Sequence, residues 1–171
     1  MSDTLRVLTV RQPWAWAIIH GGKDVENRTR NIAGAYRGPV AIHAGLAVDE
    51  SIEDPDDPMY GLIFGPCPNS GDEQHNRYTC EWCTEIQPEQ YGNAGCVIGI
   101  ADLVGVHPDC TESVEGYGHL PTCSPWAMSD HQHITLVNPR PLAHPIPAKG
   151  RLGLWHPGAE LEAAIWEQVA A

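Results

Sequence analysis

Lysine and arginine are scarce in this sequence. Its 171 residues include 10 of these basic residues against 22 Asp and Glu, so the formal net charge is −12. A uniformly acidic surface argues against nucleic-acid binding, because phosphate contacts need Lys and Arg. The sequence also has no apolar run of the ~18–20 residues that span a bilayer. Its N-terminus lacks the basic and apolar regions of a signal peptide, which predicts a cytoplasmic, reducing location and no membrane partner.

Several common motifs are absent as well. There is no glycine-rich nucleotide-binding loop and no Ser/His/Asp arrangement in a recognisable context. There is also no internal repeat, heptad pattern or low-complexity tract. Hydrophobic residues make up 42% and charged residues 19%, which is typical of a single globular domain over residues 1–171. The 17 Gly and 15 Pro favour short elements joined by turns over a helical bundle.

The acidic residues are unevenly distributed. Residues 1–43 contain six basic and three acidic residues, a net charge of +3. Residues 44–90 contain eleven acidic residues and one Arg, a net charge of −10, and residues 91–171 carry −5. The segment with the motifs described below is therefore locally basic. The acidic middle is interpreted either as a solvated surface or as a site for a protein partner.

The hydrophobic pattern predicts five or six short strands and two helices. A helix over residues 14–20 is apolar nearly all round, and two glycines end it. A second helix over 160–170 carries one apolar stripe of Leu161, Ile165 and Val169, which we expect to dock on the body of the domain. The predicted strands are 5–10, 24–28, 40–43, 96–106, 133–137 and parts of 145–155.

These elements predict an α+β fold around a small, mostly mixed β-barrel, with a short N-terminal helix and a C-terminal helix. The strand at 96–106 is apolar enough for burial on both faces. Residues 47–95 do not fit the pattern, because their segments rich in Pro, Gly and Asp are irregular. We interpret them as an acidic insert in the single domain. A further loop is expected up to Pro125.

Five stretches share a recognisable pattern: residues 11–15 (RQPWA), 22–28 (GKDVENR), 37–44 (RGPVAIHA), 95–99 (GCVIG) and 149–155 (KGRLGLW). With them, the chain resembles the ASCH family, named after activating signal cointegrator homology, over most of its length. The resemblance implies a PUA-like β-barrel and a cleft between the early helix and the barrel, lined by the Gly-x-Lys-x-x-Glu-x-Arg residues. It also implies binding of RNA or DNA. A few small members are enzymes, among them an N4-acetylcytidine amidohydrolase and a ribonuclease.

Lys23, Glu26 and Arg28 are the first candidate site residues. After two glycines, Lys23 is expected at the mouth of the cleft, where its ammonium contacts phosphate or acts as a base if its pKa is depressed. Glu26 is a candidate general acid or general base, or a hydrogen-bond acceptor for the edge of a nucleobase. Its spacing of two places it on the same strand face as Arg28. The alternatives are a surface lysine and a structural Glu26–Arg28 ion pair.

Other residues are candidates for contacts around that site. Arg11, Arg30 and Arg37 supply a phosphate-binding flank, because the planar fork of Arg suits phosphate. Trp126 is a candidate for stacking an unpaired base, and His43 for a position facing the cleft. A core position is the alternative for both rings, and it is the expected position of the Trp residues in 14–16.

One departure bears on catalysis. In the amidohydrolase members, a Thr stands three residues after the lysine, whereas this sequence has Glu26. The Lys23/Glu26 pairing is closer to the cointegrator-like members, which resemble binding modules. Lys23 and Glu26 remain the catalytic candidates if the protein is an enzyme.

The cysteines predict a possible zinc site. Cys80 and Cys83 form a C-x2-C pair, the spacing that suits two thiolates on tetrahedral zinc. Cys67 and His75 would complete a Cys3His set that orders the insert. The alternative partners are Cys110 and Cys123, which bracket another loop, and the thiols can also be free.

Three functions follow as hypotheses. The first is a nucleic-acid-binding module for RNA or DNA, holding a single strand or a modified base. The second is a hydrolase of a modified nucleoside such as an N4-acylcytidine, or a ribonuclease. The third is a protein-interaction adaptor that uses the acidic insert.

Overall fold

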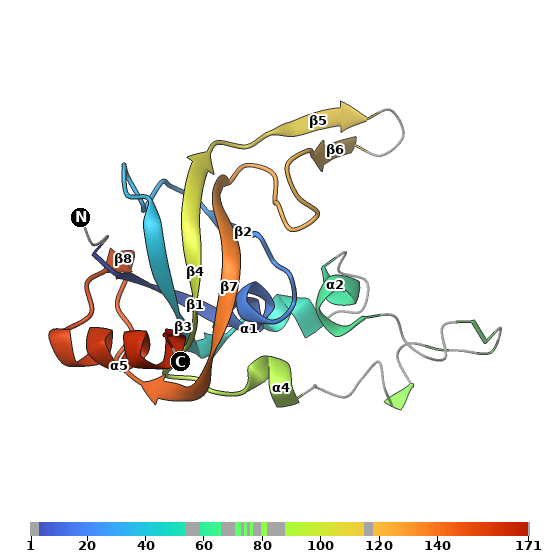
Figure 1. Ribbon diagram of the computed structural model, residues 1–171. Coiled ribbons are helices and arrows are strands. Elements are labelled where there is room, and N and C mark those ends of the chain that lie inside the picture. The colour runs from blue at the N-terminus through green and yellow to red at the C-terminus, as the bar shows by residue number, and fades with distance from the viewer. Residues whose placement is uncertain are drawn as a thin grey trace.

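The centre of the protein is one six-stranded sheet with a short hairpin extending from it (Figure 1). The computed structural model describes residues 4–53, 59–65, 71–72, 74, 76, 80–81, 88–114 and 118–170. The strands are β1 (Arg6–Gln12), β2 (Val25–Arg28), β3 (Gly38–Val48), β4 (Cys96–His107), β5 (Thr111–Val114), β6 (Gly118–Pro121), β7 (Gln132–Pro147) and β8 (Leu154–Trp155). The helices are α1 (Trp14–Ile19), the 3-10 turn η1 (Glu50–Glu53), α2 (Tyr60–Phe64), α4 (Pro88–Tyr91) and α5 (Ala159–Val169).

The sheet is mixed and curls so that its two ends approach. Its strand order is β2-β7-β4-β3-β1-β8, in which β1 and β3 are parallel and the other pairs are antiparallel. Although β2 and β1 lie far apart in this order, the Arg28 guanidinium of β2 donates to the Thr9 carbonyl of β1 at 2.9 Å. The α+β class and the barrel-like sheet are thus confirmed.

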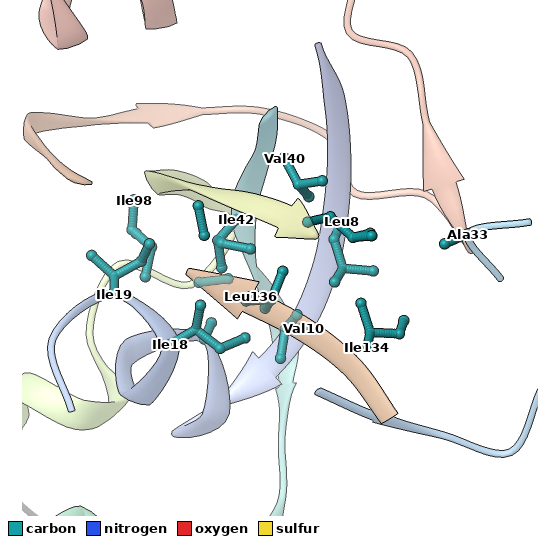
Figure 2. Packing of buried hydrophobic residues seen from close by; sticks show 14 residues of the cluster. Leu8, Val10, Ile18, Ile19, Ala33, Val40, Ile42, Ile98, Ile134 and Leu136 are labelled. Atoms are coloured by element: carbon teal, nitrogen blue, oxygen red, sulfur yellow. The ribbon is translucent and has the colours of Figure 1, made fainter. Parts of the chain in front are cut away.

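Helix α1 packs on the inner face of the curled sheet. Its Ile18 and Ile19 are buried against apolar side chains from β1, β3, β4 and β7 (Figure 2). Every residue of β4 from Val97 to Ala101 is buried, because α1 covers one face and α5 the other. Burial of this strand on both faces, expected from its dense apolar run, is confirmed.

Helix α5 packs on the outer face of the sheet. Ile165 is fully buried in a second cluster with side chains of β1, β3, β4 and β7, and Leu161 and Val169 pack against the same cluster. The predicted apolar stripe therefore does dock on the body. No helix in the described part of the chain has both the length and the apolar character that crossing a membrane requires.

Strand β7 is three times longer than the predicted strand at 133–137. It runs over Gln132–Pro147 and contains four prolines, which usually indicate a break in a strand. Only its first part pairs with β2, over Gln132–Thr135, so beyond Thr135 its one partner strand in the described sheet is β4. Proline is tolerated there because one edge of the strand has no partner strand in the described sheet.

Two predicted loops contain regular structure. The segment before Pro125, expected to be a loop, includes the β5–β6 hairpin. The insert expected to be irregular over 47–95 begins within β3 and includes η1, α2 and α4. Ile52 and Ile63 from this insert are buried in a third cluster together with Ala17 of α1. These apolar side chains give the short helices a surface to pack on, which composition alone did not indicate.

Close packing of α1 on β4 generates a testable prediction. A Cβ added at Gly99 would lie 2.6 Å from Ile19 Cδ1 and 2.8 Å from the Arg140 carbonyl oxygen, whereas one at Gly105 would meet nothing closer than 3.5 Å. We expect Gly99→Ala to lower the free energy of unfolding by about 1–3 kcal/mol through overpacking. Gly105→Ala, in the same strand, is the matched control and should change it by less than about 0.5 kcal/mol. Urea unfolding of both variants measures the difference, and equal midpoints would contradict the packing.

Candidate functional site

The end of helix α1 turns Lys23 into the protein. The buried Gln12 side chain accepts a hydrogen bond from the Trp16 amide at 2.9 Å near the start of the helix. At the other end the Gly21 and Lys23 amides both donate to the Ala17 carbonyl at 2.9 Å, and Gly22 adopts a left-handed φ of 73°. Such a φ favours glycine. The reversal leaves Lys23 only 3% exposed, so its expected position at a surface mouth is wrong.

Lys23, Glu26 and Arg28 form one ion-paired group, called the Lys23 network below. The Lys23 Nζ lies 3.4 Å from Glu26 Oε2, and the Arg28 guanidinium lies 3.0 Å from Glu26 Oε1. Lys23 also donates a hydrogen bond to the Val25 carbonyl. Glu26 is 7% exposed, so both charges of the inner pair are buried. The proposed structural Glu26–Arg28 ion pair is therefore present, and Lys23 extends it.

The Lys23 network lies where β2 faces β1, a line called the β1–β2 seam below. In the described sheet, β8 pairs only with Val7 and Leu8 of β1, so the next carbonyl, that of Thr9, has no partner from β8. The Arg28 guanidinium donates to this carbonyl. The Arg28 side chain remains 29% exposed, which makes it the member of the network that meets solvent.

Burial decides the electrostatics of Lys23. Desolvation lowers the pKa of Lys23 below its ordinary value of 10.5, because the charged ammonium loses water. The carboxylates of Glu26 and Asp24 oppose this shift, and the positive charge of Arg28 adds to it. The Lys23 Nζ also lies over the face of the Trp14 ring, 5.7 Å from the ring centroid. A lysine with a lowered pKa is chemically able to act as a base or a nucleophile.

Thr9 also organises the other side of the seam. Its hydroxyl oxygen accepts hydrogen bonds from the Arg151 amide at 3.3 Å and the Trp155 indole at 3.2 Å. Gly150 packs tightly there, because a Cβ added at this position would lie 2.7 Å from Cε1 of the His43 ring. The sequence stretch 149–155 is thus brought next to β1. Thr9 had no distinctive signal in the sequence, because its role depends on contacts across the fold.

His43 and Trp126 both occupy core positions, the alternative interpretation of each ring. His43 is 1% exposed, and its Nε2 lies 2.9 Å from the Ala148 carbonyl. Trp126 is 5% exposed and packs in the cluster with Ile52 and Ile63. In this arrangement, the Trp126 ring offers no open face for a base.

The arginines of the expected phosphate-binding flank lie at the surface. Arg11 and Arg30 are exposed, two residues beyond Thr9 and Arg28 respectively, so they extend from the two sides of the seam. Arg37 is exposed as well, but its guanidinium donates to the Gly34 and Tyr36 carbonyls of its own turn. Of the three, Arg30 is therefore the nearest in the chain to the Lys23 network, two residues after Arg28.

A second group of side chains has the character of a metal site. The ligand atoms of His107, Cys110, Cys123 and His133, called the His2Cys2 cluster below, all lie within 4.8 Å of one another. Cys110 and Cys123 were alternative partners in the sequence interpretation, but neither histidine was predicted. The sequence signal that could have indicated His107 is its His-x2-Cys spacing to Cys110. His133 joins the cluster because it pairs with His107 between β4 and β7.

The zinc ligands predicted in the insert are mostly outside the described residues. This holds for Cys67, His75 and Cys83, whereas Cys80 is described and is a partly buried thiol that forms no disulfide. Among the described residues, the His2Cys2 cluster is the group of potential ligands that lie close enough together to hold a metal ion.

The two thiols of the cluster differ in acidity. Desolvation raises the pKa of both. For Cys110, hydrogen bonds with Thr122 and Cys123 outweigh desolvation and lower the pKa to about 6. For Cys123, the neighbouring Cys110 adds to desolvation and raises the pKa to about 11. One thiolate beside one thiol is a pair that a cation can convert into two thiolate ligands.

No protein-family model matches the sequence, and no curated protein matches it. The contacts of the residues themselves therefore carry the functional inference.

The buried ammonium predicts a pH dependence of stability. The unfolded chain binds the Lys23 proton more tightly than the folded chain, whose Lys23 pKa is lowered. Between that lowered pKa and 10.5, the wild type should therefore gain stability relative to Lys23→Met as pH rises, by at most about 1.4 kcal/mol for each pH unit. Urea unfolding at several pH values up to 10 measures this difference. The control is Lys149→Met at the exposed second lysine, and a wild-type advantage that stays flat or falls would contradict the burial effect.

Proposed function

We propose that the protein is a nucleic-acid-binding module of the ASCH, PUA-like type, which holds a base of RNA or single-stranded DNA at the β1–β2 seam. The observation that carries the proposal is the Lys23 network, because it places three charged side chains at one point where the sheet closes. The curled α+β sheet and the packing of the early helix against it support the proposal.

The donors and acceptors of the network suit a base edge. Arg28 is the partly exposed member of the network, and the N–H groups of a guanidinium match the carbonyl and ring nitrogen acceptors of a nucleobase. The Glu26 carboxylate lies directly behind it and accepts hydrogen bonds, as from an exocyclic amino group. Lys23 keeps Glu26 paired from the buried side. A nucleobase that approaches Arg28 therefore meets the guanidinium donors first and the Glu26 carboxylate acceptor next.

The charge distribution favours a small, selective site. The segment 1–43 has a net charge of +3, whereas the whole chain has −12. Exposed Arg11 and Arg30 extend from the two strands of the seam and suit the phosphates on either side of a bound base. The acidic remainder repels long polyanions, so affinity depends on the local contacts.

Oligonucleotide binding tests the proposal. We expect labelled single-stranded RNA or DNA to bind with a salt dependence, and Arg11→Ala to reduce the slope of log K against log salt by about 0.7. Arg28→Ala should weaken binding of the preferred base by about 1–3 kcal/mol through loss of the base contact. Fluorescence anisotropy over a series of KCl concentrations measures both effects, and paired RNA and DNA oligonucleotides show whether the 2′-hydroxyl is read.

Two variants make the binding result specific. Arg140→Ala removes one positive charge that pairs with Asp102 outside the Lys23 network, and it should bind like the wild type. Arg28→Lys keeps the charge but loses the planar fork, so it should retain the salt slope and lose base preference. Equal affinities for wild type, Arg11→Ala and Arg28→Ala would refute the assignment of the seam.

A second candidate function rests on the acidity of Lys23. A lysine of lowered pKa, 3.4 Å from a carboxylate, is suited to act as a base on a modified nucleoside such as an N4-acylcytidine. Glu26 in place of the Thr of the amidohydrolase members disfavours this chemistry. Incubation with N4-acetylcytidine, followed by chromatography, tests it: turnover by the wild type that Lys23→Met abolishes would establish a hydrolase.

The metal of the module is proposed to be zinc. Two thiolates and two imidazoles form a ligand set that zinc prefers in structural sites. All four tetrahedral positions are filled by protein, which leaves none for a substrate, so the ion would stabilise the fold rather than catalyse a reaction.

A further inference from the structure

We infer that a zinc ion bound by the His2Cys2 cluster clamps residues 123–133 onto β2 and thereby fixes the strand that carries Glu26 and Arg28. The inference extends the proposed zinc site from a ligand set to a mechanical role. It rests on the proposed function only in its last step, where β2 is the strand of the binding site.

Two distances within the cluster match those of a tetrahedral zinc site. Zinc–sulfur bonds of about 2.3 Å and zinc–nitrogen bonds of about 2.1 Å place sulfur and nitrogen roughly 3.6 Å apart at the tetrahedral angle. The His133 Nδ1 lies 3.6 Å from Cys110 Sγ and 3.4 Å from Cys123 Sγ. The His133 nitrogen and the two sulfurs are thus already spaced to bind one ion, and the fourth ligand atom lies within 4.8 Å of them.

The backbone sets the tautomer of both histidines. The His133 Nε2 lies 2.8 Å from the Met128 carbonyl, which can only accept, so Nε2 carries the proton and Nδ1 presents its lone pair to the thiols. The His107 Nδ1 lies 2.8 Å from the Pro108 carbonyl, which leaves His107 Nε2 as the ligand atom. In metal-binding histidines, the ring nitrogen that does not bind the metal typically donates such a hydrogen bond.

The cluster closes the base of the β5–β6 hairpin. Cys110 immediately precedes β5, and Cys123 follows β6 by two residues. The hairpin extends away from the ends of β4 and β7 (Figure 1). A two-stranded hairpin is only marginally stable by itself. The Thr122 hydroxyl donates to the Cys110 carbonyl at 2.6 Å across this base, and a metal would add a further link there.

The segment between the ligands Cys123 and His133 is bonded to β2 and to the residue before it. The Ser124 hydroxyl donates to Asp24 Oδ1 at 2.5 Å. The Asn27 amide group donates to the Trp126 carbonyl at 2.8 Å, and its oxygen accepts from the Met128 amide at 3.0 Å. The Met128 carbonyl in turn accepts the hydrogen bond from His133 Nε2. A continuous path of hydrogen bonds therefore leads from a metal ligand to the strand that carries Glu26 and Arg28.

Metal content tests the site. Full-length protein purified without chelators should contain one zinc ion per chain by elemental analysis, and Cys110→Ser and Cys123→Ser should lose it. Cys80→Ser and Cys96→Ser remove thiols outside the cluster and should retain it. Replacement of zinc by cobalt in the wild type should give the visible spectrum of a tetrahedral ion with thiolate ligands, a readout that does not depend on the folding of any variant.

Hydrogen exchange tests the clamp. After removal of zinc, amides of β2 and of residues 124–128 should exchange about tenfold faster, since loss of one net hydrogen bond's stabilisation has this effect. Amides of α5 are the internal control and should not change. Asn27→Ala should keep the zinc but speed exchange in β2, because it removes the hydrogen bonds to Trp126 and Met128 and leaves the ligands in place.

The outcomes separate the proposals. A zinc content near zero, or a content lost in Cys80→Ser but kept in Cys110→Ser, would overturn the His2Cys2 site. Bound zinc with unchanged β2 exchange on its removal would overturn the clamp. If zinc and clamp behave as expected while no oligonucleotide binds, only the proposed nucleic-acid function fails.

Discussion

The Arg28 guanidinium links β2, one end strand of the curled sheet, to β1, and the candidate site depends on this contact. At the end of the sheet opposite β2, β8 pairs only with Val7 and Leu8 of β1, and Arg28 of β2 donates to the next carbonyl, that of Thr9. The same guanidinium pairs with Glu26, which in turn pairs with Lys23. Buried charges are tolerated only when partners compensate the lost hydration. The closure of the sheet and the burial of Lys23 are therefore one arrangement.

Strand β2 is where the two candidate sites meet. One of its faces carries the Lys23 network, and its Asn27 is bonded to the segment that contains Trp126 and Met128. That segment connects two members of the His2Cys2 cluster. Only four residues long, β2 pairs with β7 alone in the described sheet. So short an edge strand has few hydrogen bonds of its own, and its Asn27 and Arg28 side chains add bonds to neighbouring segments.

The fold was predictable where hydrophobic periodicity and packing agree. Strand β4 and helix α5 followed their apolar patterns, because both bury the side chains that the patterns mark. The length of β7 was not predictable, because proline usually ends a strand and the open edge that tolerates it is a property of the whole sheet. The burial of Ile52 and Ile63 was hidden for a similar reason, since their partners Ala17 and Trp126 are distant in sequence.

The sequence by itself determined the chemical types at the site and one local contact. Lys23, Glu26 and Arg28 are close in the chain, so a glycine turn and the two-residue strand period suffice to bring them together. Only the tertiary structure decided that Lys23 is buried and that Arg28 bonds to Thr9. It also decided that His107 and His133 join two cysteines that the sequence associated with a loop. Strand pairing sets such contacts, because it depends on the packing of the complete sheet rather than on neighbouring residues.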